Sequence, residues 1–274
     1  MNKNKYLLGK QNLKSRSTKG LDFIKLDKSE VEDSIKEMSE ELASLQELIF
    51  AENKHRVLIV LQGLDTSGKD GTVKHVFSAT NPQGVKVASF KEPNDIEKSH
   101  DFLWRIHKEV PRNGEITIFN RSHYEDFIVP YVHKLLPNKR LKDRIEEINH
   151  FEKFLINEGV TIIKFFLHVS KKEQAQRIQE RIDSPKKHWK FSLSDLHERQ
   201  FWNRYQEAYD MALKATHHPD RPWYVIPADH KRIRDCIVSK ILVSHLRALK
   251  ADLPGIDPKV LKKIQKEATQ LLKK

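Results

Sequence analysis

Cysteine is nearly absent from this chain, since Cys236 is the single one among 274 residues. One cysteine excludes an internal disulfide and a cysteine-rich metal site, and the apolar neighbours Ile233 and Ile237 predict that it is buried and inert. No apolar run approaches the roughly 20 residues of a membrane span, and the basic N-terminus lacks the apolar core of a signal sequence. We therefore expect a cytoplasmic protein with no membrane partner.

Acidic residues are in the minority. The chain has 38 Asp and Glu residues and 50 Lys and Arg residues, which gives a formal net charge of +12. Such an excess favours a polyanionic partner, namely nucleic acid, anionic lipid or another phosphate polymer, although solubility alone is the simpler explanation. The sequence contains no helix-turn-helix, zinc or interleaved aromatic signature, which argues against nucleic acid as that partner.

Short apolar runs divide most of the chain, and they are unbroken rather than alternating. Unbroken runs are typical of strands that are covered on both faces, as in a parallel sheet. The runs alternate with helical patterns, which predicts an α/β three-layer sandwich whose ligands bind at the carboxyl ends of the strands. The five predicted strands are 57–61, 85–90, 116–119, 160–169 and 223–226.

Helical spacing accounts for the segments between these strands and for both ends of the chain. A first helix is expected to begin at Ser29, where the sequence SEVE fits a capping box. The expected domain organisation is an extended, poorly ordered segment 1–28, one domain over 29–250, and a C-terminal amphipathic helix within 251–274. Further helices are predicted over residues 100–110, 141–158, 171–183, 193–215 and 231–249.

A glycine-rich stretch, GLDTSGKDG from Gly63 to Gly71, follows the first apolar run and precedes a helical pattern. Strand, glycine-rich loop and helix in this order are typical of a phosphate-binding loop, whose amides turn toward one point at the positive end of the helix. Lys69 is placed to reach the outer phosphates. The residues expected to bind phosphate are Gly63, Thr66, Ser67, Gly68, Lys69, Gly71 and Thr72.

Two carboxylates stand in or beside this loop. The usual pattern ends in Lys followed by Ser or Thr, but here Asp70 follows Lys69, and Asp65 lies inside the loop. Carboxylates beside bound phosphates repel the substrate unless a cation intervenes, and Mg²⁺ favours oxygen ligands that it shares with phosphate. We expect Asp65 and Asp70 to hold a metal or to act on the attacking oxygen. The alternative is that Asp65 is a turn residue and Asp70 a helix N-terminal carboxylate.

The third strand runs into polar residues, FNRSHYED over 119–126, which should face the same crevice. Arg121 can bind phosphate oxygens with both arms of its guanidinium. Glu125 or Asp126 could contact the phosphate acceptor or hold a metal through water. The same residues also fit ordinary helix N-terminal capping, with Ser122 as the cap, and His123 is expected to be structural.

A basic segment, RIQERIDSPKKHWKFS over 177–192, follows the fourth strand and is predicted to be a lid. Asp183-Ser184-Pro185 should end its helix, and a mobile basic segment over a phosphate site can exclude water and neutralise developing charge. Trp189 and Phe191 are expected to anchor it. The alternative is a solvated charged face. Its expected phosphate-binding residues are Arg177, Arg181, Lys186, Lys187 and Lys190.

Together, GLDTSGKDG, FNRSHYEDF and ERIDSPKKHWKF resemble the motifs of the polyphosphate kinase 2 family, and the resemblance covers roughly residues 21–249. It implies a P-loop kinase-like fold similar to that of thymidylate kinases, with five parallel strands, a basic lid and helical extensions at both ends. It also implies phosphoryl transfer between inorganic polyphosphate and nucleotides with Mg²⁺ or Mn²⁺. Members tend to be oligomeric, so a homodimer or homotetramer is expected.

The resemblance further implies a set of working residues. Asp65, Lys69, Asp70 and Arg121 would be catalytic, with Asp65 and Asp70 at the metal. Asn120 and Glu125 would bind the nucleotide, and Asp126 is expected there from its place beside Glu125. A FNRSHYED motif resembles the subgroup that accepts both AMP and ADP, forming ATP, and guanine nucleotides are expected as well.

Two alternatives remain open on the sequence. An ATP-dependent nucleoside monophosphate kinase of the thymidylate kinase type would have the same fold and loop, but its lid would cover one triphosphate and would not need so many basic residues. A basic nucleic-acid-binding protein could use the loop for nucleotide hydrolysis, although the sequence lacks the corresponding motifs.

Overall fold

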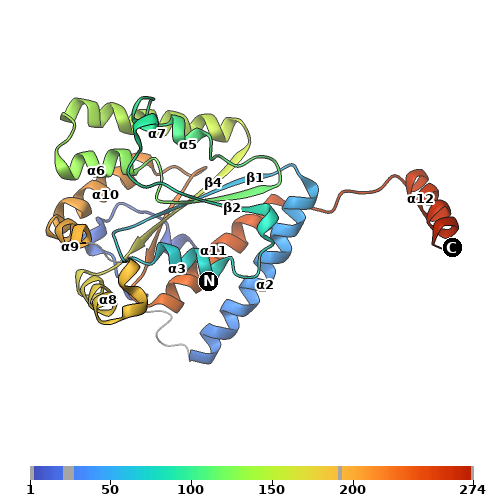
Figure 1. The fold of residues 1–274 in the computed structure, drawn as a ribbon, viewed down its shortest axis with the longest axis horizontal. Coiled ribbons are helices and arrows are strands. Elements are labelled where there is room, and N and C mark those ends of the chain that lie inside the picture. The colour runs from blue at the N-terminus through green and yellow to red at the C-terminus, as the bar shows by residue number, and fades with distance from the viewer. Residues whose placement is uncertain (1–2, 21–27, 191–192, 273–274) are drawn as a thin grey trace.

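The computed structural model describes residues 3–20, 28–190 and 193–272. Its centre is a sheet of five parallel strands in the order β2-β3-β1-β4-β5 (Figure 1). The crossovers on either side of β1 give the sheet a switch point at the carboxyl end of β1, where ligands bind in open α/β sheets. The strands are β1 (Arg56–Gln62), β2 (Val85–Ser89), β3 (Glu115–Asn120), β4 (Val160–His168) and β5 (Trp223–Pro227).

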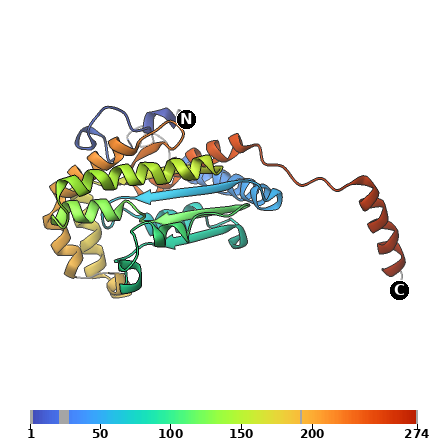
Figure 2. The same cartoon turned by 90° about the horizontal axis from the view of Figure 1, so that it is seen from above.

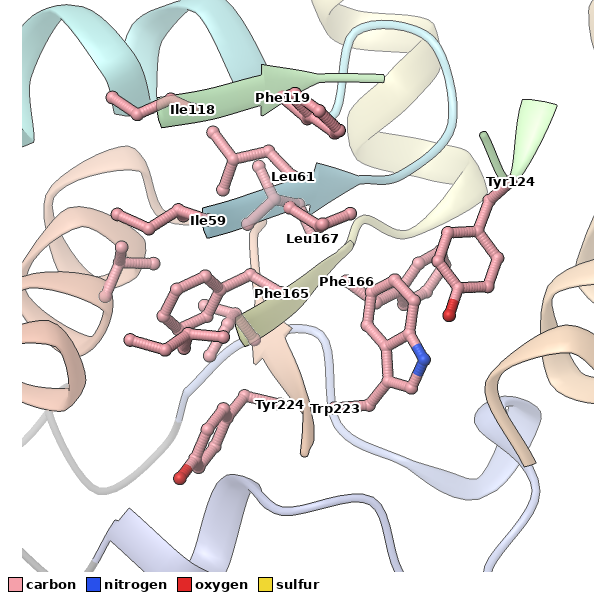
Figure 3. Packing of buried hydrophobic residues seen from close by; sticks show 14 of the residues in the cluster. Ile59, Leu61, Ile118, Phe119, Tyr124, Phe165, Phe166, Leu167, Trp223 and Tyr224 are labelled. Carbon is pink, nitrogen blue, oxygen red and sulfur yellow. The ribbon is translucent and has the colours of Figure 1, made fainter. Parts of the chain in front are cut away.

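The core lies where the sequence has its longest apolar runs. In β1, every residue from Val57 to Gln62 is buried, because β3 and β4 flank the strand and helices cover both faces of the sheet. Figure 3 shows Ile59 and Leu61 of β1 packed among side chains of β3 and β4. The prediction of a parallel sheet from unbroken hydrophobicity is confirmed.

Helices form a layer on each face, so the predicted three-layer α/β/α architecture is confirmed (Figures 1 and 2). One layer contains α2 (Lys28–Glu52), α3 (Lys69–Val76) and α11 (Lys231–Leu249). The other contains α6 (Glu125–His133), α7 (Asn138–Asn157) and α10 (Trp202–Thr216). The remaining helices of the carboxyl edge are α8 (Lys171–Asp183), the 3-10 helix η4 (Pro185–Lys190) and α9 (Leu193–Gln200). Within the described ranges, no helix is both long and apolar enough to cross a membrane.

Several local predictions were wrong. The second strand is not covered on both faces, because β2 is an edge strand whose Val87 is 47% exposed. Instead of one helix over 100–110, only the single turn α5 (Trp104–His107) forms there, and another single turn, α4 (Asp95–Lys98), precedes it. The helix expected over 193–215 is broken at Phe201 into α9 and α10. Ser29 lies inside α2 and is therefore not its N-cap.

The N-terminal segment was expected to be extended and poorly ordered, and for residues 3–20 that expectation was wrong. The segment contains two short 3-10 helices, η1 (Lys3–Tyr6) and η2 (Leu13–Ser15), and buries Tyr6, Leu8 and Leu13. The Leu8 amide donates to the Trp223 carbonyl at 2.9 Å, so the segment covers the free edge of β5. Capping an edge strand in this way removes a site for unwanted strand pairing.

The C-terminal amphipathic helix exists as α12 (Pro258–Leu271), where Asp257 caps Lys259. Figures 1 and 2 both show α12 standing away from the sheet and its layers. Its apolar positions are exposed, from 39% at Leu261 to 72% at Leu271. A helix of this length is marginal in water by itself, so tertiary or quaternary packing is expected to stabilise it.

Candidate functional site

The loop between β1 and α3 adopts the strained backbone that its glycines permit. Gly63 has φ +153° and Gly68 φ +103°. A Cβ atom at Gly63 would lie 2.8 Å from the Leu167 carbonyl oxygen, and one at Gly68 would lie 1.8 Å from a guanidinium nitrogen of Arg234. Only glycine fits both positions, so the chain turns tightly at the carboxyl end of β1 and leads directly into α3.

Two hydroxyls of this loop have no partner within the described residues. The side-chain oxygens of Thr66 and Ser67 are buried, and neither makes a hydrogen bond. Thr66 also has φ +62°, a left-handed conformation that is rare outside glycine. Unpaired buried hydroxyls and backbone strain are typical of a site that a ligand completes, and the positive end of α3 favours an anion there.

Lys69 points back over this loop. Its ammonium group donates to the carbonyl oxygens of Gly63 at 2.7 Å and Leu64 at 3.3 Å. Burial lowers the pKa of Lys69, and the charge of Arg121 lowers it further, while Asp65, Glu125 and Asp70 oppose these effects. A charged ammonium in this position stabilises an anion strongly, because little water competes for it.

The two loop carboxylates are paired with residues that follow β3. Asp65 accepts from Arg121 Nη2 at 2.7 Å, and Asp70 accepts from Asn120 Nδ2 at 2.8 Å. The register explains this, because Leu61 of β1 pairs with Asn120 of β3 and both strands end at the same edge. The structure thus brings together the two sequence segments that were predicted to share one crevice.

Arg121 is held in a left-handed conformation, with φ +62°, and its amide donates to the Leu61 carbonyl at 3.1 Å. Burial disfavours the charged guanidinium, but Glu125 and Asp65 outweigh this and raise its pKa. Burial raises the pKa of Glu125, while Arg121 and Lys69 oppose the shift. These charges therefore form one coupled cluster at the ends of β1 and β3.

A cavity of about 310 Å³ opens from this cluster between α6, α8, α9 and α10. Asp65, Arg121 and Glu125 line one part of it. Sequence reasoning did not place several of the lining residues at the site, because their spacing on helices does not show that they face a cavity. These residues are Glu92, Val129, His133, Gln174, Glu198, Trp202, Tyr205 and Tyr209, and Arg199 lines the cavity as well.

Comparison with known proteins identifies the family to which the chain belongs. A family model described as "Polyphosphate kinase 2 (PPK2)" matches residues 25–254. The chain belongs to the polyphosphate kinase 2 family. It is 51% identical over 217 residues to an AMP/ADP-polyphosphate phosphotransferase of Meiothermus ruber, covering 79% of this chain and 81% of that protein.

Two further relatives support membership. An ADP-polyphosphate phosphotransferase of Rhodopseudomonas palustris is 42% identical over 246 residues, which is 85% of each chain. The crystal structure of polyphosphate kinase 2 from Arthrobacter aurescens TC1 is 38% identical and superposes with a TM-score of 0.91, covering 96% of this chain and 95% of that one. The family and its P-loop kinase-like fold, both expected from the three motifs, are thereby confirmed.

Not every residue that the family motifs suggest faces the cavity. Arg177 is 5% exposed, and its guanidinium donates to the loop carbonyls of Thr66 (2.9 Å) and Ser67 (3.1 Å). It also donates to Ala228 and Asp229 carbonyls and to Glu173. All of these bonds lie behind the loop, so the structure places Arg177 as a support of the loop and not at its phosphate face.

A second buried arginine supports the loop from the same side and was missed in the sequence. Arg234, at the start of α11, is 1% exposed and packs under Gly68 and Gly71. It pairs with Asp235 at 2.7 Å, and Asp235 also accepts from the Thr72 hydroxyl at 3.3 Å. Thr72 was expected to bind phosphate, but in this structure its hydroxyl is directed to α11.

Asp126 was expected at the nucleotide, yet it lies on the other side of α6. Its carboxylate pairs with Arg105 at 3.2 Å, and burial raises its pKa while Arg105 opposes the shift. Arg181 lies in the last turn of α8, and Lys186 is exposed on η4. The side chains of Lys187, Trp189 and Lys190, and all of Phe191 and Ser192, lie outside what the structure describes.

The turn after β3 rests on a buried ionic network. Glu152 of α7 accepts from Lys164 at 2.5 Å and from the Tyr124 hydroxyl at 2.7 Å, and His123 lies at 3.3 Å. Burial lowers the pKa of Lys164 to about 8. Burial opposes the charged form of Glu152 as well, but Lys164 and His123 together outweigh it and lower the pKa of Glu152 to about 2. His123 is thus placed as a structural residue, and the network fixes the turn that presents Arg121.

The carboxylates fit a magnesium ion that is shared with substrate. Within the described ranges, no three His, Cys, Asp or Glu side chains gather as a complete metal cage. Asp65 and Asp70 each use only Oδ1 in the side-chain hydrogen bonds given above, which leaves Oδ2 of both as oxygen donors. Mg²⁺ is commonly bound by one or two carboxylates together with substrate phosphates, and this donor set matches that pattern.

Proposed function

We propose that the protein transfers phosphoryl groups between inorganic polyphosphate and nucleoside mono- and diphosphates. The observation that carries the proposal is the junction of the strained phosphate loop with Arg121 and Glu125 in one cavity. Family membership and relatives that are named polyphosphate phosphotransferases support the choice of polyphosphate as donor. An ATP-dependent nucleoside monophosphate kinase is the main alternative.

In the proposed reaction, an oxygen of the terminal nucleotide phosphate attacks the terminal phosphorus of polyphosphate. A new P–O bond forms, the bridging P–O bond breaks, and its electron pair stays on the shortened polyphosphate. Phosphoryl transfer demands mainly positioning and charge stabilisation from the protein. Loop amides, Lys69 and Arg121 provide both, and the supports Arg177 and Arg234 keep the loop in place before substrate binds.

We propose Mg²⁺ or Mn²⁺ as the cofactor, held by Asp65 and Asp70. The ion would supply charge neutralisation between the carboxylates and the phosphates. Four carboxylates line the cavity, those of Asp65, Glu92, Glu125 and Glu198, against two arginines, Arg121 and Arg199. A polyphosphate end therefore meets a site that is short of positive charge unless a cation accompanies it.

Both AMP and ADP are proposed as acceptors, with guanine nucleotides as further substrates. The relative from Meiothermus ruber is named for AMP and ADP, and that from Rhodopseudomonas palustris for ADP. Glu125 stands in the cavity beside Arg121, and its carboxylate can accept a hydrogen bond from the Gln62 amide at 2.9 Å when that amide is turned toward it. Asn120 and Glu125 would position the acceptor phosphate.

The cellular setting and assembly are also part of the proposal. A cytoplasmic enzyme accords with one buried free cysteine, Cys236. We propose a homodimer or homotetramer, because the apolar face of α12 is exposed in the single chain. Sedimentation of the full chain and of a chain ending at residue 250 would test this. The same number of subunits in both would contradict a role for α12 in assembly.

One assay tests the function. Purified protein is incubated with AMP or ADP, Mg²⁺ and long-chain polyphosphate in the absence of ATP, and nucleotide products are separated. We expect ADP and ATP from AMP, and ATP from ADP. Absence of any product, together with AMP phosphorylation by ATP, would instead identify an ATP-dependent nucleoside monophosphate kinase.

A further inference from the structure

A second cavity, of about 420 Å³, lies beside the catalytic one and has a different chemistry. It is formed where the N-terminal segment lies against α10 and the carboxyl end of β4, and Figure 2 shows that segment running beside α10. Trp202 lines both cavities. We call the second one the basic cavity, because Lys14, Arg16 and Lys19 line it and no carboxylate of the described residues does.

A basic stretch of the N-terminal segment, held in place by tertiary contacts, forms one wall of this cavity. Leu13 is 1% exposed and anchors η2, and the Arg16 guanidinium donates to the carbonyls of Lys5 (3.2 Å) and Leu7 (2.9 Å). These bonds fix the backbone of the segment. Lys14 and Lys19 are exposed at its surface, and no hydrogen bond or ion pair engages either ammonium group in the described chain.

Two polar side chains at the wall of the basic cavity each have one buried nitrogen without a hydrogen-bond partner in the described part of the chain. Gln206 is 4% exposed and His168 is 5% exposed. Gln206 Nε2 and His168 Nδ1 are buried, and neither makes a hydrogen bond within the described residues. Such orphaned groups are rare in folded proteins and call for a ligand or water, and the soft terminal torsion of a glutamine lets its amide turn toward one.

Nearby electrostatics favour an anion. Ser170 lines the cavity and caps the first turn of α8 through Glu173 N, so the positive end of a 13-residue helix is close. Two carboxylates lie near the cavity. Asp229 accepts from the Ser170 amide (2.8 Å) and the Thr18 hydroxyl (2.7 Å), and Asp210 accepts from the Leu13 amide (2.9 Å) and pairs with Lys214 (2.7 Å). Neither carboxylate lines the cavity, whereas three cationic side chains do.

We propose that the basic cavity is a second phosphate-binding site, separate from the loop between β1 and α3. Its ligand is an anionic phosphate group that Lys14 and Lys19 contact, with the Gln206 amide as a neutral donor. The phosphate has two possible sources. It is either a remote part of the polyphosphate chain whose end lies in the catalytic cavity, which rests on the proposed function, or a separate phosphate or pyrophosphate ion.

Metal-free binding tests the site directly. Triphosphate and orthophosphate are titrated calorimetrically in EDTA into the full chain and into Lys69→Ala, which weakens the loop site. The test variant is Lys14→Ala/Lys19→Ala, and Lys10→Ala/Lys36→Ala removes the same charge from exposed positions outside the cavity. We expect binding that survives Lys69→Ala, is weakened about tenfold by the test variant, and is unchanged in the control. Equal affinity in test and control variants would overturn the proposal.

Steady-state kinetics then identify the source of the phosphate. If the cavity holds a remote part of the chain, the test variant raises KM for long-chain polyphosphate several-fold and leaves KM for triphosphate unchanged. If the cavity holds a separate ion, the test variant has the same two KM values as the wild type. Any effect that added orthophosphate has on the wild-type rate is then lost in the test variant. A wild-type protein without polyphosphate activity would refute the proposed function, whereas the metal-free titration would still decide the cavity.

Discussion

The two neighbouring cavities differ in the sign of their charge. The catalytic cavity carries four carboxylates against two arginines, while the basic cavity has three cationic side chains and no carboxylate among the described residues. We propose that both take phosphate and that only the catalytic cavity needs a cation to do so. The comparison indicates that this protein separates two tasks, since an acid-rich site can place a metal at the reacting phosphate and a basic site can hold charge at a distance.

Metal removal should separate the two cavities most strongly. Chelation with EDTA should abolish phosphoryl transfer, and Mg²⁺ or Mn²⁺ should restore it, because phosphates cannot approach Asp65 and Asp70 without a counter-ion. Phosphate binding in the basic cavity should persist in the same buffer. Activity that survives exhaustive chelation would contradict the assignment of Asp65 and Asp70.

Lys69→Ala should reduce kcat by roughly 100- to 1000-fold, about 3–4 kcal/mol of barrier, which is the scale of losing one preorganised donor. Lys74→Ala is the matched control, because Lys74 is an exposed lysine on the same helix. The basic cavity should bind phosphate normally in both variants. Near-normal turnover in Lys69→Ala would count against the loop as the catalytic phosphate site.

Arg234→Lys should lower kcat about tenfold with little change in KM, because the ammonium keeps the charge but loses the fork that supports Gly68 and pairs with Asp235. Arg232→Lys, a surface position in the same turn paired with Glu32, is the control. Phosphate binding in the basic cavity should not change. A loss of thermal stability without any change in kcat would show that Arg234 is only structural.

Glu125 should produce a pH effect confined to the catalytic cavity. Because burial raises its pKa, its carboxylate is lost on acidification at a higher pH than an ordinary glutamate, and the rate should fall there. Because burial disfavours the charged carboxylate of Glu125, this group lowers the free energy of unfolding at neutral pH. Glu125→Gln should therefore reduce activity, remove this acid limb and leave Tm unchanged or higher. An unaltered pH profile would contradict a role for the charge.

Much of the catalytic cavity could be predicted from the sequence, because its residues follow strands that end at one edge. Gly63 to Asp70 and Asn120 to Glu125 are short segments, and parallel strand order brings their ends together. The remainder depends on tertiary packing. Tyr205 and Tyr209 have the spacing of a buried helix face, and nothing in that spacing shows that the face borders a cavity.

The misplaced residues have a similar physical explanation. Arg177 and Arg181 share one helix face by spacing, but only the three-dimensional fold shows that Arg177 meets carbonyl groups behind the loop. The basic N-terminal segment lacks any periodic apolar pattern, so its docking through Tyr6, Leu8 and Leu13 could not be predicted. The buried pair of Glu152 and Lys164 could not be predicted, because Lys164 stands alone in an apolar strand and Glu152 lies beside Lys153 on an amphipathic helix, where a solvated charge is expected.

The most direct test of the account is a crystal structure of the protein with triphosphate and Mg²⁺. We predict phosphate density against the amides and hydroxyls of Thr66 and Ser67, with Lys69 turned from the Gly63 carbonyl to the anion and the metal beside Asp65 or Asp70. An empty loop with phosphate and metal bound elsewhere would contradict the central claim.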